Sequence, residues 1–339
     1  MSFSSKPVGR MLHTIDTGGV LGHYFAVELV ECIWEFLPMP DLLAYGNTSA
    51  LNRMQAQDFI WRRTNTEVGR FCRNPSVFQS MLWKHKAVIS GSVALASLIS
   101  PRLRGWQPCD MDVYTTSEHA NDVVTFFEKK EGYMASSQTD TPSGNYSGIG
   151  GIKAVITLTN ASSFQVDVIA CDQKALFSVI FGFYGTHLFN AITGRGLICL
   201  YPSHTLAYRS LSNWNAHIPG YISLKVQKAM VKYSRRGYTF TINPLLHLQH
   251  PHECGVSTSC PHTTRDIFDS GVLVVVATFL EKNKLLTFIP NTVAASYNVD
   301  YRNIWCLGGY ACQVEIEEPF TRAHFVREVH CGLTVPQVV

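Results

Sequence analysis

Charged side chains are scarce in this sequence. Lysine, arginine, aspartate and glutamate make up 16% of its 339 residues, whereas hydrophobic residues make up 46%. This composition excludes an intrinsically disordered chain, which needs high charge and low hydrophobicity. The formal net charge is only +3, so any site for a polyanion must be local rather than spread over a basic surface. The length predicts two or three domains, each with its own core.

Long hydrophobic runs are also missing. The longest predominantly apolar run, Val272–Leu280, is much shorter than the roughly 20 residues of a bilayer-spanning helix, and Met1–Leu12 has no apolar core of a signal peptide. The ten cysteines are scattered along a chain too large to need disulfide staples. We therefore expect a reduced intracellular protein, cytoplasmic or nuclear, that has no membrane partner.

Several familiar catalytic motifs are absent. The sequence contains no Gly-x-Ser-x-Gly elbow, no His-Glu-x-x-His helix and no dinucleotide-binding fingerprint. The Gly/Ser-rich segment Ser143–Gly151 lacks the Gly-Lys-Ser/Thr ending of a P-loop and a following helix. It therefore predicts a hairpin loop rather than a phosphate-binding loop.

Three acidic residues stand out on two predicted strands. Asp110 and Asp112 are two positions apart on a strand predicted over 111–115, so both side chains point to the same face. Asp167 is the acidic residue of a second apolar strand. Neighbouring carboxylates repel each other unless a cation lies between them. If the two strands are adjacent, the three carboxylates offer the hard oxygen ligands that suit Mg²⁺ or Mn²⁺.

A glycine and a serine precede these acids at the start of a predicted helix, residues 92–100. Gly91 lets the backbone approach an anionic group closely. Ser92 adds a hydroxyl next to the free amides of the helix N-terminus, which attract phosphate. Gly91 and Ser92 are therefore candidate nucleotide-binding residues.

The ordered set Gly91-Ser92, Asp110-x-Asp112 and Asp167 resembles the polymerase-beta-like nucleotidyltransferase superfamily. The resemblance covers about a quarter of the chain, residues 84–170. One departure is the distance of eighteen positions (110 minus 92) between Ser92 and Asp110, which is longer than usual in that superfamily. The extra residues, Pro101–Pro108, have the composition of a loop.

The resemblance implies a metal-dependent enzyme that transfers a nucleotidyl group from a nucleoside triphosphate such as ATP. Asp110 and Asp112 would hold two ions, and Asp167 would complete the shell of one ion and help deprotonate the attacking hydroxyl. The sequence leaves the acceptor open among RNA, protein and a small molecule.

The N-terminal part has helical periodicity, interrupted at Pro38. Its segments Glu28–Pro38 and Asp41–Leu43 resemble an F-box, the module that docks on the adaptor protein of a cullin ubiquitin ligase, although the usual Leu-Pro before the Glu-Leu pair is missing. Two interpretations stay open. The segment is either a docking module, making the chain an F-box-type adaptor or a catalytically silent nucleotidyltransferase-like binding protein, or a helical cap on a catalytic domain.

Two further groups of residues are candidates for ligand binding. A helix predicted over Ile222–Arg236 carries a stripe of basic residues, including Lys225, Lys228 and Lys232. In nucleotidyltransferases a helical element after the sheet commonly supplies cations to the triphosphate, and the alternative here is a solvated helix face.

The other group is Cys254, Cys260 and His262, whose residue types suit Zn²⁺. The gap between the two cysteines is wider than in a zinc knuckle. Buried thiols and a loop histidine are the alternative.

The pattern of predicted elements indicates an α+β protein. We expect a nucleotidyltransferase-like mixed sheet flanked by helices, with an N-terminal helical segment and a C-terminal mixed α/β region. The predicted divisions are a flexible leader at 1–20, an F-box-like segment at 21–66, a nucleotidyltransferase-like domain at 67–200 and a C-terminal helical and β-rich region at 201–339. Other predicted elements are a helix over 67–86, a helix over 118–131, a hairpin of strands 153–159 and 163–169, a helix over 172–183 and a strand over 197–200.

Overall fold

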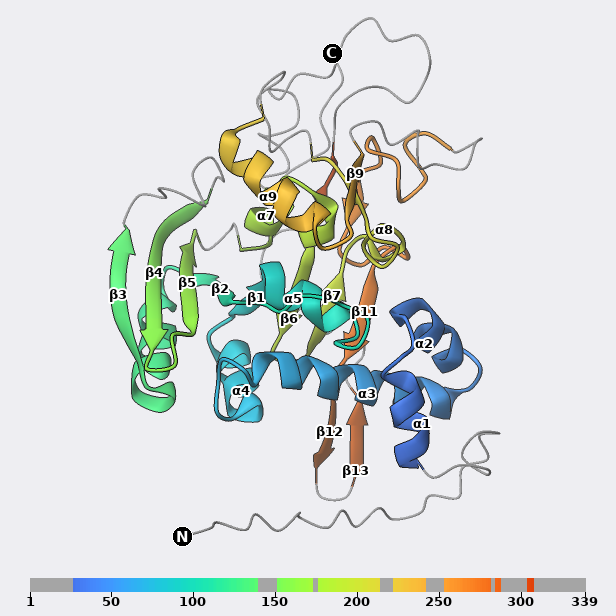
Figure 1. Cartoon of the computed structure of the whole chain (residues 1–339), viewed down its shortest axis with the longest axis horizontal. Coiled ribbons are helices and arrows are strands. Elements are labelled where there is room, and N and C mark those ends of the chain that lie inside the picture. Colours follow the sequence, from blue (N-terminus) through green and yellow to red (C-terminus); the bar gives the residue numbers. More distant parts are fainter. Residues whose placement is uncertain are drawn as a thin grey trace, which may run out of the picture.

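A large mixed sheet flanked by helices forms the centre of the protein, which is α+β as predicted (Figure 1). The computed structural model describes residues 27–139, 151–172, 176–213, 222–241, 253–281, 284–287 and 304–307. The predicted leader and most of the Gly/Ser-rich loop lie outside these ranges. Of the helices that it describes, none combines the length and the apolar character needed to cross a bilayer.

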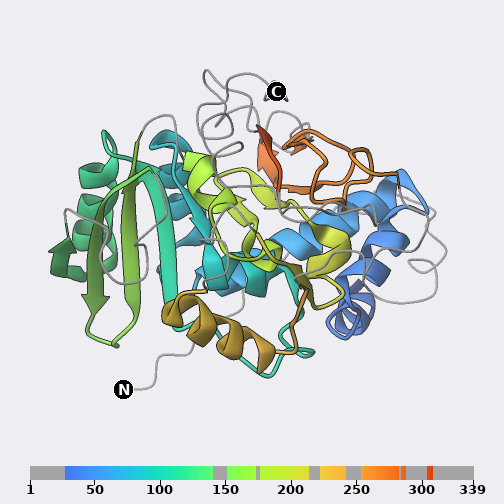
Figure 2. The same ribbon diagram turned by 90° about the horizontal axis from the view of Figure 1, so that it is seen from above.

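The sheet has eight strands in the order β11-β7-β6-β1-β2-β5-β4-β3. Only β2 and β5 run parallel; the other neighbouring strands are antiparallel. The strands β3, β4 and β5 lie at one end of the molecule and the N-terminal helices at the other (Figures 1 and 2). The bounds of the strands are β1 Val88–Ser90, β2 Asp110–Thr116, β3 Tyr133–Thr139, β4 Ile152–Asn160, β5 Gln165–Cys171, β6 Asn190–Thr193, β7 Gly196–Cys199 and β11 Leu273–Val276.

The hairpin predicted around residues 160–162 is confirmed by the antiparallel pairing of β4 with β5. Its turn is held by one side chain, because Asn160 Oδ1 accepts hydrogen bonds from the amides of Ser162 and Phe164, each 3.0 Å long. This is the local Asx chemistry that favours a turn at asparagine. The turn therefore reverses the chain direction, and β5 pairs with β4 on one side and with β2 on the other.

Nine α-helices are found in the described ranges. Six of them come before β3 in the chain, and three come after β5. Their bounds are α1 Val27–Trp34, α2 Met39–Gly46, α3 Ala50–Val68, α4 Pro75–Lys84, α5 Gly91–Leu98, α6 Ala120–Phe126, α7 Leu176–Phe181, α8 Pro202–Thr205 and α9 Leu224–Ser234. In Figure 1, α3 and α4 lie below the level of β1 and α5, whereas α7 and α9 lie above it.

The single helix predicted over 67–86 is wrong. The preceding helix α3 extends to Val68, and a separate helix α4 begins at Pro75. Asn74 caps α4 by accepting a 3.2 Å hydrogen bond from the amide of Val77, and proline suits the first helical position because its missing N–H has no helical partner there. Asn74 and Pro75 therefore mark the start of a new helix, α4, within a stretch that apolar periodicity alone predicts to be one helix.

The helix predicted over 118–131 is shorter than expected at its N-terminal end. It begins at Ala120 in α6, continues as a π-helical turn over Phe127–Glu131 and ends at Gly132. Gly132 adopts φ +77°, the left-handed conformation typical of a glycine after a helix.

Smaller elements follow the sheet. They comprise a 3₁₀ turn and three two-stranded sheets that pair β8 with β9, β10 with β14 and β12 with β13. Their bounds are η3 Thr186–Leu188, β8 Arg209–Leu211, β9 Thr239–Thr241, β10 Arg265–Asp266, β12 Thr278–Glu281, β13 Lys284–Thr287 and β14 Ile304–Trp305.

The N-terminal helices and the sheet share one hydrophobic core. Buried side chains of α1 to α3, such as Trp34, Leu42 and Ile60, belong to the same cluster as those of the strands. Helix α3 packs against α5, and every residue of α5 is buried, which explains why α5 is apolar all round. The predicted boundary between 66 and 67 falls within α3, so this helix belongs to both predicted segments.

Three arginines surround the carboxylate of Glu67 at the interface between α3 and the loop over residues 101–108. Glu67 Oε1 accepts a hydrogen bond from Arg104 Nη2, and Arg70 Nη1 lies 3.9 Å from Glu67 Oε2. Arg63 is 7% exposed, and burial lowers its pKa to about 10, with Arg104 acting in the same direction and Glu67 opposing. One carboxylate therefore compensates several buried positive charges.

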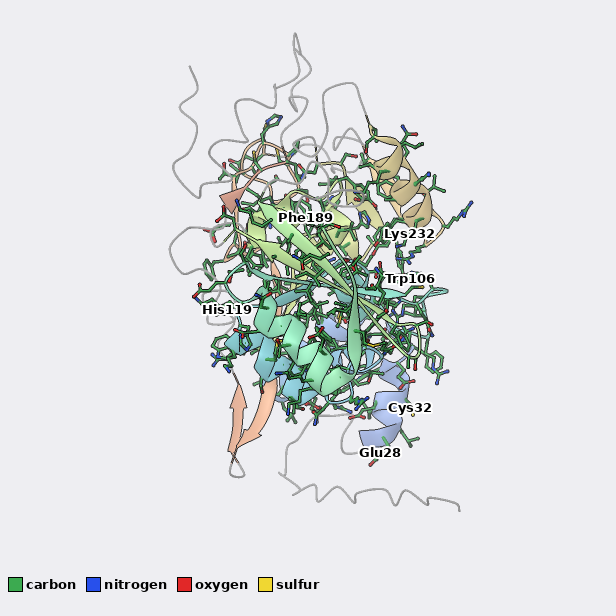
Figure 3. All side chains as sticks on the ribbon, turned by 90° about the vertical axis from the view of Figure 1, so that its left-hand side faces the viewer. Glu28, Cys32, Trp106, His119, Phe189 and Lys232 are labelled. Atoms are coloured by element: carbon green, nitrogen blue, oxygen red, sulfur yellow. The ribbon has the colours of Figure 1, made fainter. Side chains whose placement is uncertain are left out.

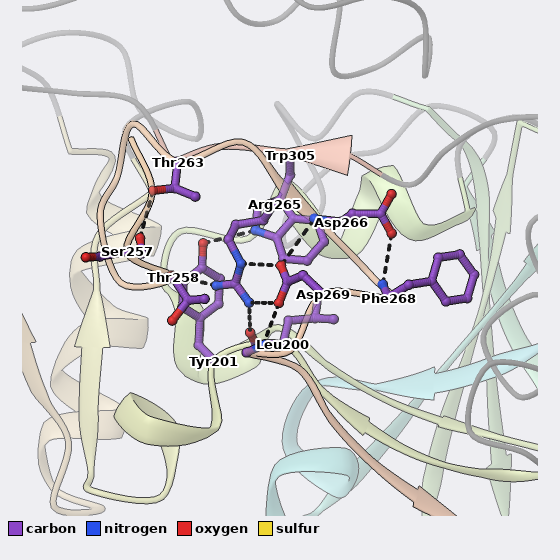
Figure 4. A network of polar contacts seen from close by, with 11 residues as sticks. Leu200, Tyr201, Ser257, Thr258, Thr263, Arg265, Asp266, Phe268, Asp269 and Trp305 are labelled. Atoms are coloured by element: carbon purple, nitrogen blue, oxygen red, sulfur yellow. Dashed lines mark hydrogen bonds and ion pairs between the residues drawn. The ribbon is translucent and has the colours of Figure 1, made fainter. Parts of the chain in front are cut away.

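The C-terminal segments are fastened to the sheet by Arg265 (Figure 4). Its guanidinium pairs with Asp269 and donates hydrogen bonds to the carbonyl oxygens of Thr258, at 2.6 Å, and Leu200, at 3.2 Å. Trp305 Nε1 donates a 3.0 Å hydrogen bond to the hydroxyl of Tyr201. Residues far apart in the sequence thus meet beside the end of β7.

Candidate functional site

The predicted acidic residues lie on one face of the sheet. The parallel register of β2 and β5 aligns Asp112 with Asp167 and Asp110 with Gln165. Aligned residues of a parallel pair point to the same side, as do residues two apart on a strand. The side chains of Asp110, Asp112 and Asp167 therefore face the same way, as the carboxylate hypothesis requires.

Polar neighbours orient the outer carboxylates. Gln165 Nε2 donates a 3.1 Å hydrogen bond to Asp167 Oδ1, and Asp167 is almost fully buried. Ser92 Oγ lies 3.3 Å from Asp110 Oδ1 and 3.4 Å from the carbonyl oxygen of Asp110, to which it donates. Ser92 thus links the start of α5 directly to the first carboxylate.

Gly91 makes room for the central carboxylate. It adopts φ +67°, and a Cβ atom at this position would overlap Asp112 Oδ2. The neighbouring Ser90 fixes the turn, because its hydroxyl donates a 2.6 Å hydrogen bond to the carbonyl oxygen of Asn190 on β6. Only glycine combines this backbone conformation with such a close approach.

Substituting Gly91→Ala is expected to lower both stability and divalent-cation affinity. The left-handed conformation costs an alanine about 1–2 kcal/mol, and the added methyl group displaces the Asp112 carboxylate. Urea unfolding and Mn²⁺ titration measure the two effects. The control is Gly105→Ala in the adjacent loop, where a Cβ atom meets nothing within 4 Å. Equal behaviour of the two variants would contradict this account of Gly91.

The donor set suits a hard divalent cation. All three side chains are carboxylates, which are the preferred ligands of Mg²⁺ and Mn²⁺. Among the described residues, these three do not form a group whose ligand atoms all lie within 4.8 Å of one another. The three carboxylates therefore share one face of the sheet without forming a compact three-ligand group in this structure.

The C-terminal end of α9 lies close to the carboxylates. Burial raises the pKa of Tyr233, and the charges of Asp112 and Asp110 raise it further while Arg236 opposes them. Burial likewise raises the pKa of Tyr114, which shares the face of β2 with the two aspartates, and Asp112 adds to this increase. Tyr233 and Tyr114 are therefore protonated neighbours of the site.

The side chains of Arg236 and Trp106 pack against each other beside Tyr233. The guanidinium carbon of Arg236 lies 4.1 Å from the ring centroid of Trp106 and 4.8 Å from that of Tyr233. Trp106 lies in Pro101–Pro108, the extra residues between Ser92 and Asp110, and this segment is a loop as predicted. No sequence motif includes Arg236, Trp106 or Tyr233. Arg236 carries one signal, because it follows the basic stripe directly.

A buried histidine supports this end of α9. The ring centroid of His187 lies 4.5 Å from that of Tyr233, and His187 Nδ1 is 2.8 Å from Ser210 Oγ. Burial lowers the pKa of His187 to about 3, and the nearby Arg236 acts in the same direction. The imidazole is therefore neutral, so it positions Tyr233 by packing rather than by charge.

The three predicted lysines lie along α9. Lys232 is exposed, and its Nζ lies 5.6 Å from the ring centroid of Tyr233. Lys228 is exposed as well. Lys225 is about 12 Å from Tyr233 along the helix axis, and burial lowers its pKa to about 8. Lys225 and Lys232 are seven residues apart on α9, about two helical turns, so they share one face; the role of the three lysines in nucleotide binding stays a prediction.

The predicted zinc ligands are only partly brought together. Cys254 Sγ and Cys260 Sγ lie 3.9 Å apart. Within the described ranges, however, His262 does not join them in a group of three ligand atoms within 4.8 Å of one another. The turn over residues 253–263 thus places two thiols side by side without assembling the three-ligand set.

A scan against protein-family models finds no match, and searches of curated proteins and of solved structures find no similar protein. The case for a function therefore depends on the residues and their geometry.

Proposed function

We propose that the chain is a nucleotidyltransferase that uses two divalent ions, Mg²⁺ or Mn²⁺, to transfer a nucleotidyl group from a nucleoside triphosphate to an acceptor. The alignment of Asp112 with Asp167 on parallel strands, two residues along from Asp110, supports this proposal most strongly. Carboxylates on one face repel one another unless a cation or another partner compensates them, and bound divalent ions would do so here.

Each carboxylate has a distinct role in this proposal. Bound ions neutralise charge on the attacking and leaving oxygens of the transfer. Asp110 and Asp112 hold the ions from one strand, with Ser92 and Gly91 fixing their side chains. Asp167, buried and oriented by Gln165, completes the ligand set and accepts the proton of the attacking hydroxyl.

Two groups of residues are suited to the phosphates. The free amides at the start of α5 and the hydroxyl of Ser92 lie next to the carboxylates and favour an anion there. Lys232, near the C-terminal end of α9, and Arg236, just after it, lie next to Tyr233. A triphosphate between α5 and α9 would meet positive charge at both ends.

The direct test is to incubate the purified full chain with each labelled nucleoside triphosphate and Mg²⁺ or Mn²⁺. RNA, protein and small-molecule acceptors are supplied separately. Release of pyrophosphate reports transfer whatever the acceptor is, and the label then identifies the acceptor. Absence of both signals with every triphosphate and every acceptor class would reject the proposal.

One observation favours a second function, docking on the adaptor of a cullin ubiquitin ligase. Helix α1 and the turn after it expose Leu29, Ile33 and Phe36, which are 55%, 53% and 61% accessible. Leu29 and Ile33 are four residues apart on α1 and share one helical face, and Phe36 follows in the turn, while Val30 and Trp34 are buried in the core. Helix α1 can therefore pack on α2 and α3 with one face, through contacts of Trp34 with Tyr45 and Phe59, and present an apolar face to a partner.

Leu29→Asp is expected to abolish co-purification of the adaptor while leaving nucleotidyl transfer unchanged. A buried charge in the interface costs far more than the lost apolar contact. The matched control is Val77→Asp on α4, which removes a side chain that is 50% exposed far from α1 in the sequence. Quantitative pull-down of the full chain measures the effect. Failure of the unmodified chain to retain the adaptor would rule out docking.

A further inference from the structure

Two histidines and an aspartate lie together beyond the C-terminal end of β2. Asp122 Oδ2 is 3.3 Å from His85 Nδ1 and 3.8 Å from His119 Nδ1. One ligand atom from each of the three residues falls within 4.8 Å of the others. His85 follows α4, His119 is the N-cap residue of α6, and Asp122 lies in the first turn of α6. The cluster therefore joins two separate helices.

The strand β2 holds both histidine backbones in place. Thr115 Oγ1 donates a 2.9 Å hydrogen bond to the carbonyl oxygen of His85. The amide of His119 donates a hydrogen bond of the same length to the carbonyl oxygen of Thr116. Consecutive residues of β2 therefore hold the backbones of the two histidines close to each other.

The imidazole of His85 faces the carboxylate of Asp122. Its side chain is only 12% exposed, and its Nδ1 is buried and lies 3.3 Å from Asp122 Oδ2. An imidazole ligates a metal ion in its neutral form, through the lone pair of a ring nitrogen, so binding here would displace the proton that faces Asp122.

We propose that His85, His119 and Asp122 bind a divalent transition-metal ion of the zinc class. Two imidazole nitrogens and one carboxylate oxygen suit Zn²⁺, Co²⁺ or Ni²⁺ better than Mg²⁺. Ligand atoms around a tetrahedral ion with bonds of about 2.0–2.1 Å are roughly 3.3–3.4 Å apart. The Asp122–His85 distance of 3.3 Å matches this range, and the Asp122–His119 distance of 3.8 Å is longer. Three protein ligands leave the fourth position to water or a further ligand.

This site is distinct from the three carboxylates. Asp112 and Thr116 are separated by roughly 13 Å along β2, and in Figure 3 His119 lies on the opposite side of the molecule from Trp106 and Lys232. The ion would tie the junction of α4 and β1 to the start of α6, and hence stabilise the folded state through mass action. The proposal does not depend on nucleotidyl transfer.

The test is titration of the full chain with Zn²⁺ by calorimetry and with Co²⁺ by visible absorption, which reports tetrahedral coordination. His119→Gln and Asp122→Asn are expected to weaken binding by about 10–100-fold or more, since even loss of an outer-shell partner costs that much. Both side chains are partly exposed, at 24% and 60%, so the variants should fold; equal metal-free melting temperatures check this. Zn²⁺ should raise the melting temperature of the unmodified chain more than that of either variant.

Two controls exclude other donors. The double variant Cys254→Ser/Cys260→Ser removes the adjacent thiols, and Asp110→Asn alters the carboxylate site. Zn²⁺ affinity is expected to survive in both and to resist a large excess of Mg²⁺. Absence of binding to the unmodified chain would overturn the proposal, as would undiminished binding to both His119→Gln and Asp122→Asn, or loss of binding in a control.

Discussion

Asp112→Asn is expected to abolish nucleotidyl transfer without unfolding the protein. Asparagine keeps the shape of the side chain beside Gly91 but loses the charge that holds a divalent ion. The rate of pyrophosphate release should fall by about 10²–10³-fold or more, the order found when a transition-state contact is removed. Asp110→Asn should behave in the same way, because the two residues point to the same place from one strand.

Stability distinguishes this effect from structural damage. Asparagine matches aspartate in size and shape, so the free energy of unfolding without metal should change by less than about 1 kcal/mol in both variants. The matched control is Asp172→Asn, just beyond the far end of β5, where an exposed carboxylate lies 3.7 Å from Lys153 Nζ. Asp172→Asn should transfer at the normal rate. Normal turnover in both Asp110→Asn and Asp112→Asn would reject the mechanism.

Glu67→Gln is expected to destabilise the fold by about 3–5 kcal/mol, the usual cost of leaving a buried charge without its partner. Glu67 and Arg104 have side chains only 3% exposed, and Arg63 and Arg70 lie nearby. Glutamine keeps the volume but removes the negative charge that compensates these arginines. Urea denaturation of the full chain measures the loss.

A second substitution tests the electrostatic cause. Adding Arg104→Met to Glu67→Gln removes one unpaired charge, so the double variant should recover part of the stability lost by the single variant. Glu128→Gln, on an exposed site, should change stability by less than about 0.5 kcal/mol. A loss below about 1 kcal/mol in Glu67→Gln would show that the arginines are stabilised in another way.

Local signals predicted those parts of the fold that local interactions build. The hairpin of β4 and β5 follows from Asn160 and alternating strand residues, and α5 follows from Gly91-Ser92 and a uniformly apolar stretch. The break between α3 and α4 was missed because apolar periodicity continues across it, although Asn74-Pro75 carried the signal. The addition of β6, β7 and β11 to the sheet depends on pairing between distant segments, which no local pattern encodes.

In the candidate site, too, local sequence patterns predicted some residues, and only the tertiary structure brought in the others. Asp110-x-Asp112 gave the position of two carboxylates from strand geometry alone, whereas the register that aligns Asp167 with Asp112 appears only in the structure. Trp106 and Arg236 come from a loop and from the residues after a helix, and they meet only because α9 folds back over the sheet. His85 and His119 had no motif at all.

The sequence by itself determined the α+β class, the two strands that carry the acids and the glycine-serine start of α5, because side-chain periodicity and turn chemistry act between near neighbours. The tertiary structure decided the rest. It set the single core shared by the N-terminal helices and the sheet, the charge cluster around Glu67 and the meeting of two histidines with Asp122. These features arise from packing between segments tens to hundreds of residues apart, where burial and register rather than local preference choose the contacts.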